Sequence, residues 1–217
     1  MNKLVIIDFE TTGFSGYKDQ IIEIGALKVS LDQPLEYETY STLVKADALL
    51  PQKIIEITHI TDGMLKEKGI EQLDAAQALY QFIDEDAIIM GYNVMFDIGF
   101  LVPFFKKYIS NSYTFNHSVL DVLTVFRDRH PYPHKLGDAV NHYQVDTPST
   151  HRALDDVIAT YHVFLNMLKE KEQTFETYIN SIGYNHKYGY RGLKFPQLQM
   201  FPQRNGMKDI EIAKKFR

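Results

Sequence analysis

Two acidic residues directly after an unbroken apolar run constrain this chain more than any other feature. The run Leu4–Ile7 is typical of a strand that is buried on both faces of a sheet. Side chains alternate along a strand, so Asp8 and Glu10 point to the same face. Two adjacent carboxylates repel one another and lose hydration, which is costly unless a divalent cation compensates. The pair therefore predicts a metal site, unless Glu10 lies beyond the strand end in water.

The composition fits one globular domain with room for an appendage, because 217 residues can bury a sizeable core. The chain has no cysteine, which excludes disulfides and thiolate metal sites and leaves oxygen and imidazole as ligands. It has no run of ~20 apolar residues, and its early first strand leaves no room for a signal peptide. We therefore expect a cytoplasmic protein with no membrane partner.

The order of apolar patterns predicts three antiparallel strands, followed by alternating helices and strands. Strands are expected at Leu4–Phe9, Ile21–Val29, Glu36–Val44, Ala87–Met90 and Val119–Val122. Helices are expected at Pro51–Ile57, 71–84, Asp97–Tyr108, Asp121–Arg129, Leu136–His142 and Ala153–Lys171. Pro103 predicts an interruption or kink in the third of these helices. Together these elements predict an α/β domain with a mixed sheet.

Two further acidic segments complete a recognisable set. They are Asn93-Val94-Met95-Phe96-Asp97 and His151-Arg152-Ala153-Leu154-Asp155-Asp156. With Asp8-Phe9-Glu10-Thr11-Thr12-Gly13 they resemble the three motifs of the DEDDh 3′–5′ exonucleases, which include the proofreading epsilon subunit of DNA polymerase III and the exonuclease domain of PolC-type polymerases. The resemblance runs from about Lys3 to Leu168 and implies a ribonuclease-H-like fold, a mixed five-stranded sheet flanked by helices. We predict an exonuclease domain at 1–171 and a C-terminal extension at 172–217.

Phosphodiester cleavage requires an activated water and stabilised charge on the phosphate and the leaving oxygen, which a pair of divalent ions supplies. The resemblance implies two Mg²⁺ or Mn²⁺ ions held by Asp8, Glu10, Asp97 and Asp156. Taken alone, Asp97 would suit the first turn of a helix without any metal. The prediction is a divalent-metal-dependent 3′–5′ exonuclease that releases nucleoside 5′-monophosphates from DNA 3′ ends, with proofreading as a role implied by the resemblance.

Helical periodicity does not choose between Asp155 and Asp156. Both flank the apolar stripe of the helix that begins at Ala153, at similar angles on opposite sides. Asp155 even lies on the same side as His151, at the spacing of a metal-binding pair. The family motif places the ligand five residues after the histidine, which selects Asp156 and leaves Asp155 as the alternative.

His151 is the candidate general base, because an imidazole with an ordinary pKa of ~6.5 can take a proton near neutral pH. The family resemblance implies the same role. The preceding residues Pro148-Ser149-Thr150 are expected to form a loop that could swing the imidazole over the site. The alternative is an ordinary surface histidine, since the chain has eight histidines.

The turn after the first strand is expected to receive the terminal nucleotide. The resemblance places Thr11, Thr12 and Gly13 near the 3′-hydroxyl, with Phe14 on the terminal sugar or base. Phe14 could instead be a hydrophobic staple under the sheet. Further candidate substrate contacts, each with a core or helix-capping alternative, are Ile60, Met64, Asn93 and Phe96. Similar family members place His59 at the border of the cleft and use Asp121 as a supporting rather than a metal-binding residue.

Charge is distributed unevenly along the chain. Residues 1–171 carry 15 Lys and Arg against 24 Asp and Glu, whereas residues 172–217 carry 8 against 4. An exonuclease that holds a few nucleotides at a strand end does not need a broad basic surface. In the second segment basic residues alternate with aromatic ones: Lys187, Arg191, Lys194 and Arg204 with Tyr184, Tyr188, Tyr190 and Phe195. This pattern suits single-stranded nucleic acid, a loop wrapped over the domain, or a docking surface for a polymerase.

DNA is the predicted substrate because the motifs resemble polymerase-associated exonucleases most, and a single-stranded 3′ end and a DNA polymerase are the expected partners. The first alternative is an exoribonuclease of the same family, acting on RNA ends. The alternative from another class is a non-catalytic nucleic-acid-binding module. Such a module should lack a carboxylate or the histidine, and this chain has all five residues. The residues alone do not decide between Mg²⁺ and Mn²⁺ or between a free-standing nuclease and a polymerase accessory. They also do not give the oligomeric state.

Overall fold

A mixed sheet with two helical layers forms the body of the protein, whose computed structural model describes residues 3–147, 150–170 and 175–215. The strands of this sheet are β1 (Lys3–Thr11), β2 (Ile21–Ser30), β3 (Tyr37–Leu43), β4 (Ile88–Gly91) and β5 (Val119–Asp121). Their order is β3-β2-β1-β4-β5. β1, β2 and β3 are antiparallel neighbours, whereas β1, β4 and β5 run parallel. This arrangement confirms the predicted architecture.

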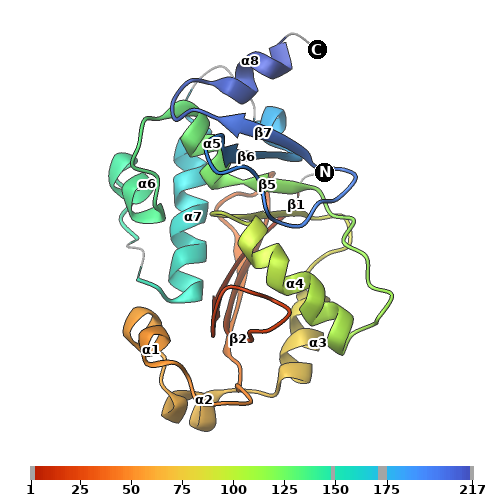
Figure 1. The fold of residues 1–217 in the computed structure, drawn as a ribbon. Helices are drawn as coiled ribbons and strands as arrows, with labels where there is room; N and C mark the ends of the chain where they lie inside the picture. The colour runs from red at the N-terminus through yellow and green to blue at the C-terminus, as the bar shows by residue number, and fades with distance from the viewer. Residues whose placement is uncertain (1–2, 148–149, 171–174, 216–217) are drawn as a thin grey trace.

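The helices cover both faces of the sheet (Figure 1). They are α1 (Gln52–Thr58), α2 (Asp62–Lys68), α3 (Gln72–Phe82), α4 (Met95–Tyr108), α5 (Val122–Arg129), α6 (Leu136–His142), α7 (Ala153–Met167) and α8 (Asp209–Lys215), with a short 3₁₀ helix, η1 (Phe175–Tyr178). α3 and α4 pack on one face, and α5, α6 and α7 pack on the other. Within the described ranges, no helix has the length and apolar character that a membrane span requires.

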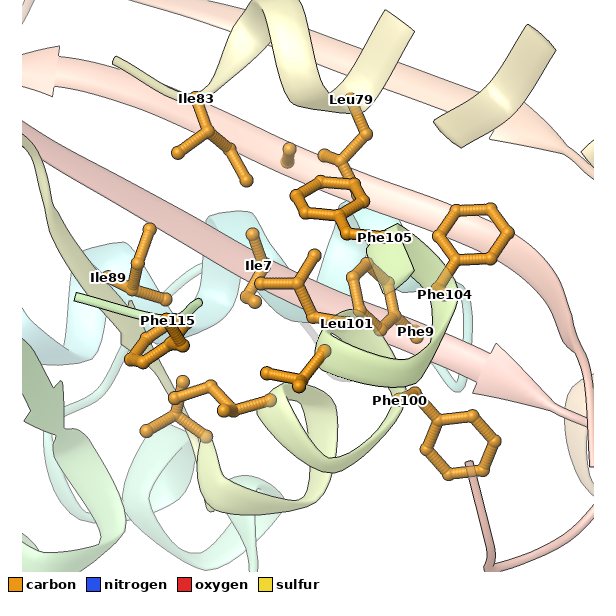
Figure 2. Packing of buried hydrophobic residues seen from close by; sticks show 14 of the residues in the cluster. Ile7, Phe9, Leu79, Ile83, Ile89, Phe100, Leu101, Phe104, Phe105 and Phe115 are labelled. Atoms are coloured by element: carbon orange, nitrogen blue, oxygen red, sulfur yellow. The ribbon is translucent and has the colours of Figure 1, made fainter. Parts of the chain in front are cut away.

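The central strand β1 contributes to both cores, which explains its unbroken apolar run. Val5, Ile7 and Phe9 join the cluster under α3 and α4, part of which Figure 2 shows. Leu4 and Ile6 join the cluster under α5, α6 and α7. Because side chains alternate along β1, Asp8 and Glu10 lie on the same face of the sheet as Leu4 and Ile6, which is the face that α7 covers.

Helix α4 begins two residues before the predicted start and is continuous through Pro103. A proline in a helix lacks the N–H that would bond the carbonyl four residues earlier, here that of Gly99. The turn between β1 and β2 passes this carbonyl so closely that a Cβ added at Gly16 would collide with the Gly99 oxygen. The helix is therefore not interrupted, whereas a kink at Pro103 stays a prediction. Glycine at position 16 lets the turn approach the helix there.

The described part of the predicted C-terminal extension packs against α5. It contains two parallel strands, β6 (Ser181–Asn185) and β7 (Gln199–Gln203), and α8. The buried Asp128 carboxylate at the end of α5 accepts hydrogen bonds from the Ile210 and Glu211 N–H groups, at 3.1 and 3.3 Å, and from Gln203 Nε2 and the Tyr178 hydroxyl, at 3.3 and 3.1 Å. One side chain on α5 thus caps α8 and fixes η1 and β7.

The outer edge of the main sheet is also closed by this segment. The Asn180 side-chain oxygen accepts a hydrogen bond from the Val119 N–H at 2.8 Å, and the Asn180 backbone N–H donates one to the Val119 carbonyl at 2.7 Å. The edge strand β5 therefore does not present unpaired backbone groups at this position. The predicted boundary at 171/172 falls on residues 171–174, outside the described part of the chain. The predicted helix end at Lys171 is wrong, because α7 ends at Met167 and residues 168–170 form a turn.

Candidate active site

Acidic side chains from β1 and α4 meet where β1 extends past its neighbour. β4 pairs with β1 only as far as Ile6, so the later Phe9 N–H has no strand partner on that side. It donates instead to Asp97 Oδ1 at 3.0 Å, from the first turn of α4, and Asp97 is only 2% exposed. Because β1 continues to Thr11, Glu10 lies within the strand beside Asp8 and not beyond its end.

Helix α7 brings the remaining predicted residues to the same place. Asp156 lies in its first turn and is 8% exposed, and His151 lies just before the helix on an exposed loop. Ligand atoms of Glu10, His151 and Asp156 lie within 4.8 Å of one another. β1, α4 and α7 thus gather the four predicted carboxylates and the histidine into one cluster.

Mutual repulsion in this cluster shows in the pKa values of its carboxyl groups. Burial, together with the charges of Asp156 and Glu23, raises the pKa of Asp8 to about 8. Burial, with the charges of Asp8, Asp156 and Glu23, raises the pKa of Glu10 to about 9. Burial and the charge of Asp8 also raise the pKa of Asp97. Without a cation this site holds more negative charge than its surroundings accommodate.

The structure separates the roles of Asp155 and Asp156. The Thr150 hydroxyl donates to Asp155 Oδ2 at 2.6 Å, so Asp155 fastens the loop before α7. Asp156 accepts the Thr150 N–H at 3.0 Å through Oδ1, and its charge raises the pKa of both Asp8 and Glu10. The geometry therefore favours Asp156 as the residue facing the carboxylate cluster, which is the choice that the family motif makes.

An ion pair that the sequence analysis missed anchors the loop carrying His151. The Arg152 guanidinium donates from Nε and Nη2 to the Glu23 carboxylate at 2.6–3.2 Å, and the Ala153 N–H donates to Glu23 Oε2 at 3.0 Å. Glu23 is 2% exposed and lies directly opposite Glu10 in the β1–β2 register. His151 itself has a φ of 55°, a left-handed conformation that is uncommon outside glycine and asparagine. The fork-like pairing of Arg152 therefore fixes the chain on one side of a strained residue.

The turn after β1 uses its two threonine hydroxyls internally. Thr11 Oγ1 donates to the Gly13 carbonyl at 2.7 Å, and Thr12 Oγ1 accepts the Gln20 N–H at 2.9 Å. Phe14 at the tip is 87% exposed, so the alternative that it is a staple under the sheet is wrong. The turn presents this aromatic side chain to solvent four residues after Glu10 in the chain, and its contact with substrate stays a prediction.

The other predicted substrate contacts differ in their exposure. Ile60 is fully buried in a cluster with Ile22 and Leu65, which favours its core alternative. Met64 and Phe96 are partly buried against core clusters and keep one side free.

Asn93 is exposed, and its side chain does not cap α4, whose N-cap residue is Val94. The N–H groups of Asn93 and Val94 both donate to Asp121 Oδ1, at 2.8 and 3.2 Å. Thr124 Oγ1 donates to the other oxygen of this buried carboxylate at 2.6 Å. Asp121 therefore holds the segment that leads into Asp97 and remains outside the cluster, while His59 is exposed at the end of α1.

Aromatic residues of the C-terminal segment pack within the fold, whereas the four basic residues that alternate with them are exposed. Phe195 packs on Phe115 with ring centroids 5.0 Å apart, and the Tyr190 hydroxyl donates to the Leu193 carbonyl at 2.6 Å. Arg204 pairs with Asp209 at 2.6 Å, whereas Tyr188 remains 66% exposed. These contacts favour the wrapped-loop alternative for Phe195 and Tyr190, and the role of the exposed basic residues stays a prediction.

Comparison with known proteins points to one family. The profile of the RNase_T exonuclease family matches residues 5–164. PolC-type DNA polymerase III from Bacillus subtilis is 31% identical over 183 residues, and the enzyme from Thermotoga maritima is 34% identical over 169 residues. These matches cover 83% and 76% of this chain, and the chain covers 12% of the length of each relative.

Solved structures of Escherichia coli exonuclease I share the fold. The complex with a dA16 oligonucleotide superposes with a TM-score of 0.68 at 20% identity, covering 79% of this chain and 42% of that one. The zinc-bound form of the complex with single-stranded DNA gives 0.69 at 20% identity, covering 79% and 41%. At this identity the likeness is one of fold.

The two aspartates at the start of α7 should respond differently to loss of charge. We expect Asp156→Asn to lower the rate of hydrolysis by at least ~100-fold, because Asp156 faces the cluster. Asp155→Asn should keep most of the activity, because its side chain is bonded to Thr150 instead. Steady-state hydrolysis of a labelled oligonucleotide measures both, and the reverse ranking would show that Asp155 is the functional residue.

Replacing Arg152 should affect the reaction more than the binding of substrate. Arg152→Lys keeps the positive charge but loses the planar fork, so we expect kcat to fall ~10-fold with KM little changed. Arg204→Lys is the matched control, since Arg204 forms a similar pair with Asp209 away from the cluster. A loss of thermal stability in Arg152→Lys without any change in kcat would assign the pair a purely structural role.

Stability in the absence of divalent metal should fall as the pH rises. Between the ordinary carboxyl pKa of ~4 and the raised values of about 8 and 9 for Asp8 and Glu10, the native state binds more protons than the unfolded state. The free energy of unfolding in chelator should therefore decrease across this interval. Urea titrations at several pH values measure it, and the double variant Asp8→Asn, Glu10→Gln should give a flatter profile. An equally steep decrease in the double variant would place the responsible groups elsewhere.

Proposed function

This chain belongs to the exonuclease family, and from that premise we propose that it is a divalent-metal-dependent 3′–5′ exonuclease acting on DNA. It would release nucleoside 5′-monophosphates from a free 3′ end. The observation that carries the proposal is the convergence of Asp8, Glu10, Asp97, Asp156 and His151 at one end of β1. A binding module has no need of such a repulsive cluster, which costs folding free energy.

The donor set fits a pair of Mg²⁺ or Mn²⁺ ions. Carboxylate oxygens are the ligands that hard divalent cations prefer, and four carboxylates from three elements surround this place. The raised pKa values of Asp8 and Glu10 indicate an excess of negative charge, which cations would offset. Asp8, Glu10, Asp97 and Asp156 would hold the ions. When bound, the ions would stabilise the charge that develops on the phosphate and on the leaving 3′-oxygen.

His151 would act as the general base. Its imidazole lies on the exposed side of the cluster, with a ring nitrogen within 4.8 Å of carboxylate oxygens of Glu10 and Asp156. From this position the ring can take the proton from a water that attacks the phosphate. The Arg152–Glu23 ion pair keeps the loop, and with it the imidazole, against the sheet.

The β1–β2 turn would hold the terminal nucleotide. Internal hydrogen bonds of Thr11 and Thr12 fix the turn, so the side chain of Phe14 projects from a rigid base. An exposed aromatic ring can stack on any base, at ~1–3 kcal/mol, which suits a nuclease that removes nucleotides regardless of sequence. Met64 and Phe96 would border the same nucleotide from α2 and α4.

DNA is favoured over RNA by the relatives. The curated matches are DNA polymerases of the PolC type, and the solved neighbours include exonuclease I bound to deoxyoligonucleotides. Proofreading beside a DNA polymerase would follow from the same likeness, with the polymerase as partner. An exoribonuclease would use the same carboxylates, and the two differ in their treatment of the 2′-hydroxyl.

The proposal is tested with two 5′-labelled single strands of identical sequence, one DNA and one RNA, incubated with Mg²⁺ or Mn²⁺. We expect a ladder that shortens the DNA from its 3′ end, with mononucleotide 5′-phosphates as products, and no shortening in chelator. Asp8→Ala should lower the rate by at least ~100-fold while its melting temperature in chelator stays equal or rises, because a repelling charge is removed. Asp146→Ala, which removes an exposed acid elsewhere, should behave as the unaltered protein.

Each other outcome points to a definite alternative. Faster shortening of RNA than of DNA would favour the exoribonuclease. Tight binding of the 3′ end without hydrolysis in either metal would favour the non-catalytic module. Full activity in Asp8→Ala would contradict the assignment of the cluster as the active site.

A further inference from the structure

A second group of metal-ligating side chains lies at the opposite end of α7. His130 follows α5, His142 is the last residue of α6, and Glu170 lies in the turn after α7. Ligand atoms of these three side chains lie within 4.8 Å of one another. The 15-residue helix α7 spans roughly 22 Å, so this group is remote from Asp156 in the first turn of the same helix. Figure 1 shows α5, α6 and α7 together on this flank of the molecule.

The Glu170 carboxylate is held with one oxygen directed at the histidines. Arg129 Nη1 lies 3.2 Å from Oε2, and His130 Nε2 lies 3.3 Å from Oε1. Burial would raise the pKa of Glu170, but hydrogen bonds with His130, Tyr143 and Arg129 lower it to about 2. The carboxylate is therefore ionised, and Arg129 orients it from the side away from the imidazoles.

One of the three ligand separations in this group matches that of a tetrahedral zinc site. With metal–ligand bonds of ~2.0–2.1 Å and tetrahedral angles, two ligand atoms lie ~3.4 Å apart. The His130–Glu170 separation of 3.3 Å already meets this value. The ring of His142 lies 4.3 Å from that of His130, centroid to centroid, and its side chain is exposed and able to turn toward the other two. Two imidazoles and one carboxylate form a ligand set that binds borderline cations such as Zn²⁺ in preference to Mg²⁺.

We propose that His130, His142 and Glu170 form a zinc site that ties α5, α6 and α7 together, with a fourth position for water or the Tyr143 hydroxyl. The Tyr143 oxygen lies 2.9 Å from His130 Nε2, which places it beside the same point. Each ligand comes from a different helix or its flanking turn, so the ion would bridge segments that are otherwise joined by the ring contact of Phe126 with His142 and by the Arg129–Glu170 ion pair. The site is independent of the exonuclease reaction.

The same side chains could form a hydrogen-bonded network without metal, since His130 already contacts Tyr143 and Glu170. Cobalt distinguishes the two cases, because Co²⁺ absorbs visible light strongly in a tetrahedral site with nitrogen ligands and weakly in an octahedral site of oxygens. Titration of the full chain with Co²⁺ should give the intense bands with a stoichiometry of one. The catalytic carboxylates, which would favour octahedral oxygen coordination, should not contribute to them.

His142→Asn should abolish these bands, whereas His59→Asn, which removes an exposed histidine on α1, should leave them unchanged. At free Zn²⁺ ~100-fold above the dissociation constant, the melting temperature of the unaltered chain should rise by roughly 5–10 °C more than that of His142→Asn. The rate of DNA hydrolysis in Mg²⁺ should be the same in His142→Asn as in the unaltered chain. Absent bands, or bands of equal intensity in His142→Asn and the unaltered chain, would overturn the proposal.

Discussion

The apolar packing of β1 on both faces of the sheet holds together acidic groups that repel one another at the end of this strand. The strand itself is stabilised by apolar side chains on both faces, and this burial outweighs the cost of placing Asp8 and Glu10 at its end. β4 pairs with β1 only as far as Ile6, so the Phe9 N–H donates to Asp97 instead of to β4. This hydrogen bond places the start of α4 beside the carboxylates of β1. A site that is unfavourable without cations is thus built by the favourable packing around it.

Much of the fold could be predicted from residue patterns alone. The apolar run Leu4–Ile7 predicts a buried strand, and in the structure its side chains pack alternately into the two hydrophobic clusters. Helix α6 has the predicted bounds of Leu136–His142. α2 was missed because its seven residues carry a single buried apolar side chain, Leu65. β6, β7 and α8 were missed because contacts distant in sequence hold them, above all those of Asp128. The predicted break at Pro103 failed because tertiary packing keeps α4 continuous.

For the site, the sequence predicts candidate residues that the structure brings together, but it does not describe their contacts. The family prediction from the three motifs is confirmed by the profile match over 5–164. Periodicity could not choose between Asp155 and Asp156, since the difference lies in which of them Thr150 engages through its hydroxyl. Glu23 was overlooked because its partner Arg152 is distant along the chain, and only the register opposite Glu10 reveals its place. The exposure of Phe14 likewise required the three-dimensional turn.

The central claim is that this carboxylate cluster binds catalytic cations, and a crystal grown with Mn²⁺ and a nucleoside 5′-monophosphate tests it most directly. Anomalous scattering from manganese locates the ions without reference to any assumed ligand. The account predicts two peaks about 3.5–4 Å apart, bounded by Asp8, Glu10, Asp97 and Asp156, with the nucleotide phosphate against them. A cluster without manganese at saturating Mn²⁺, its carboxylates protonated or turned to solvent, would contradict it.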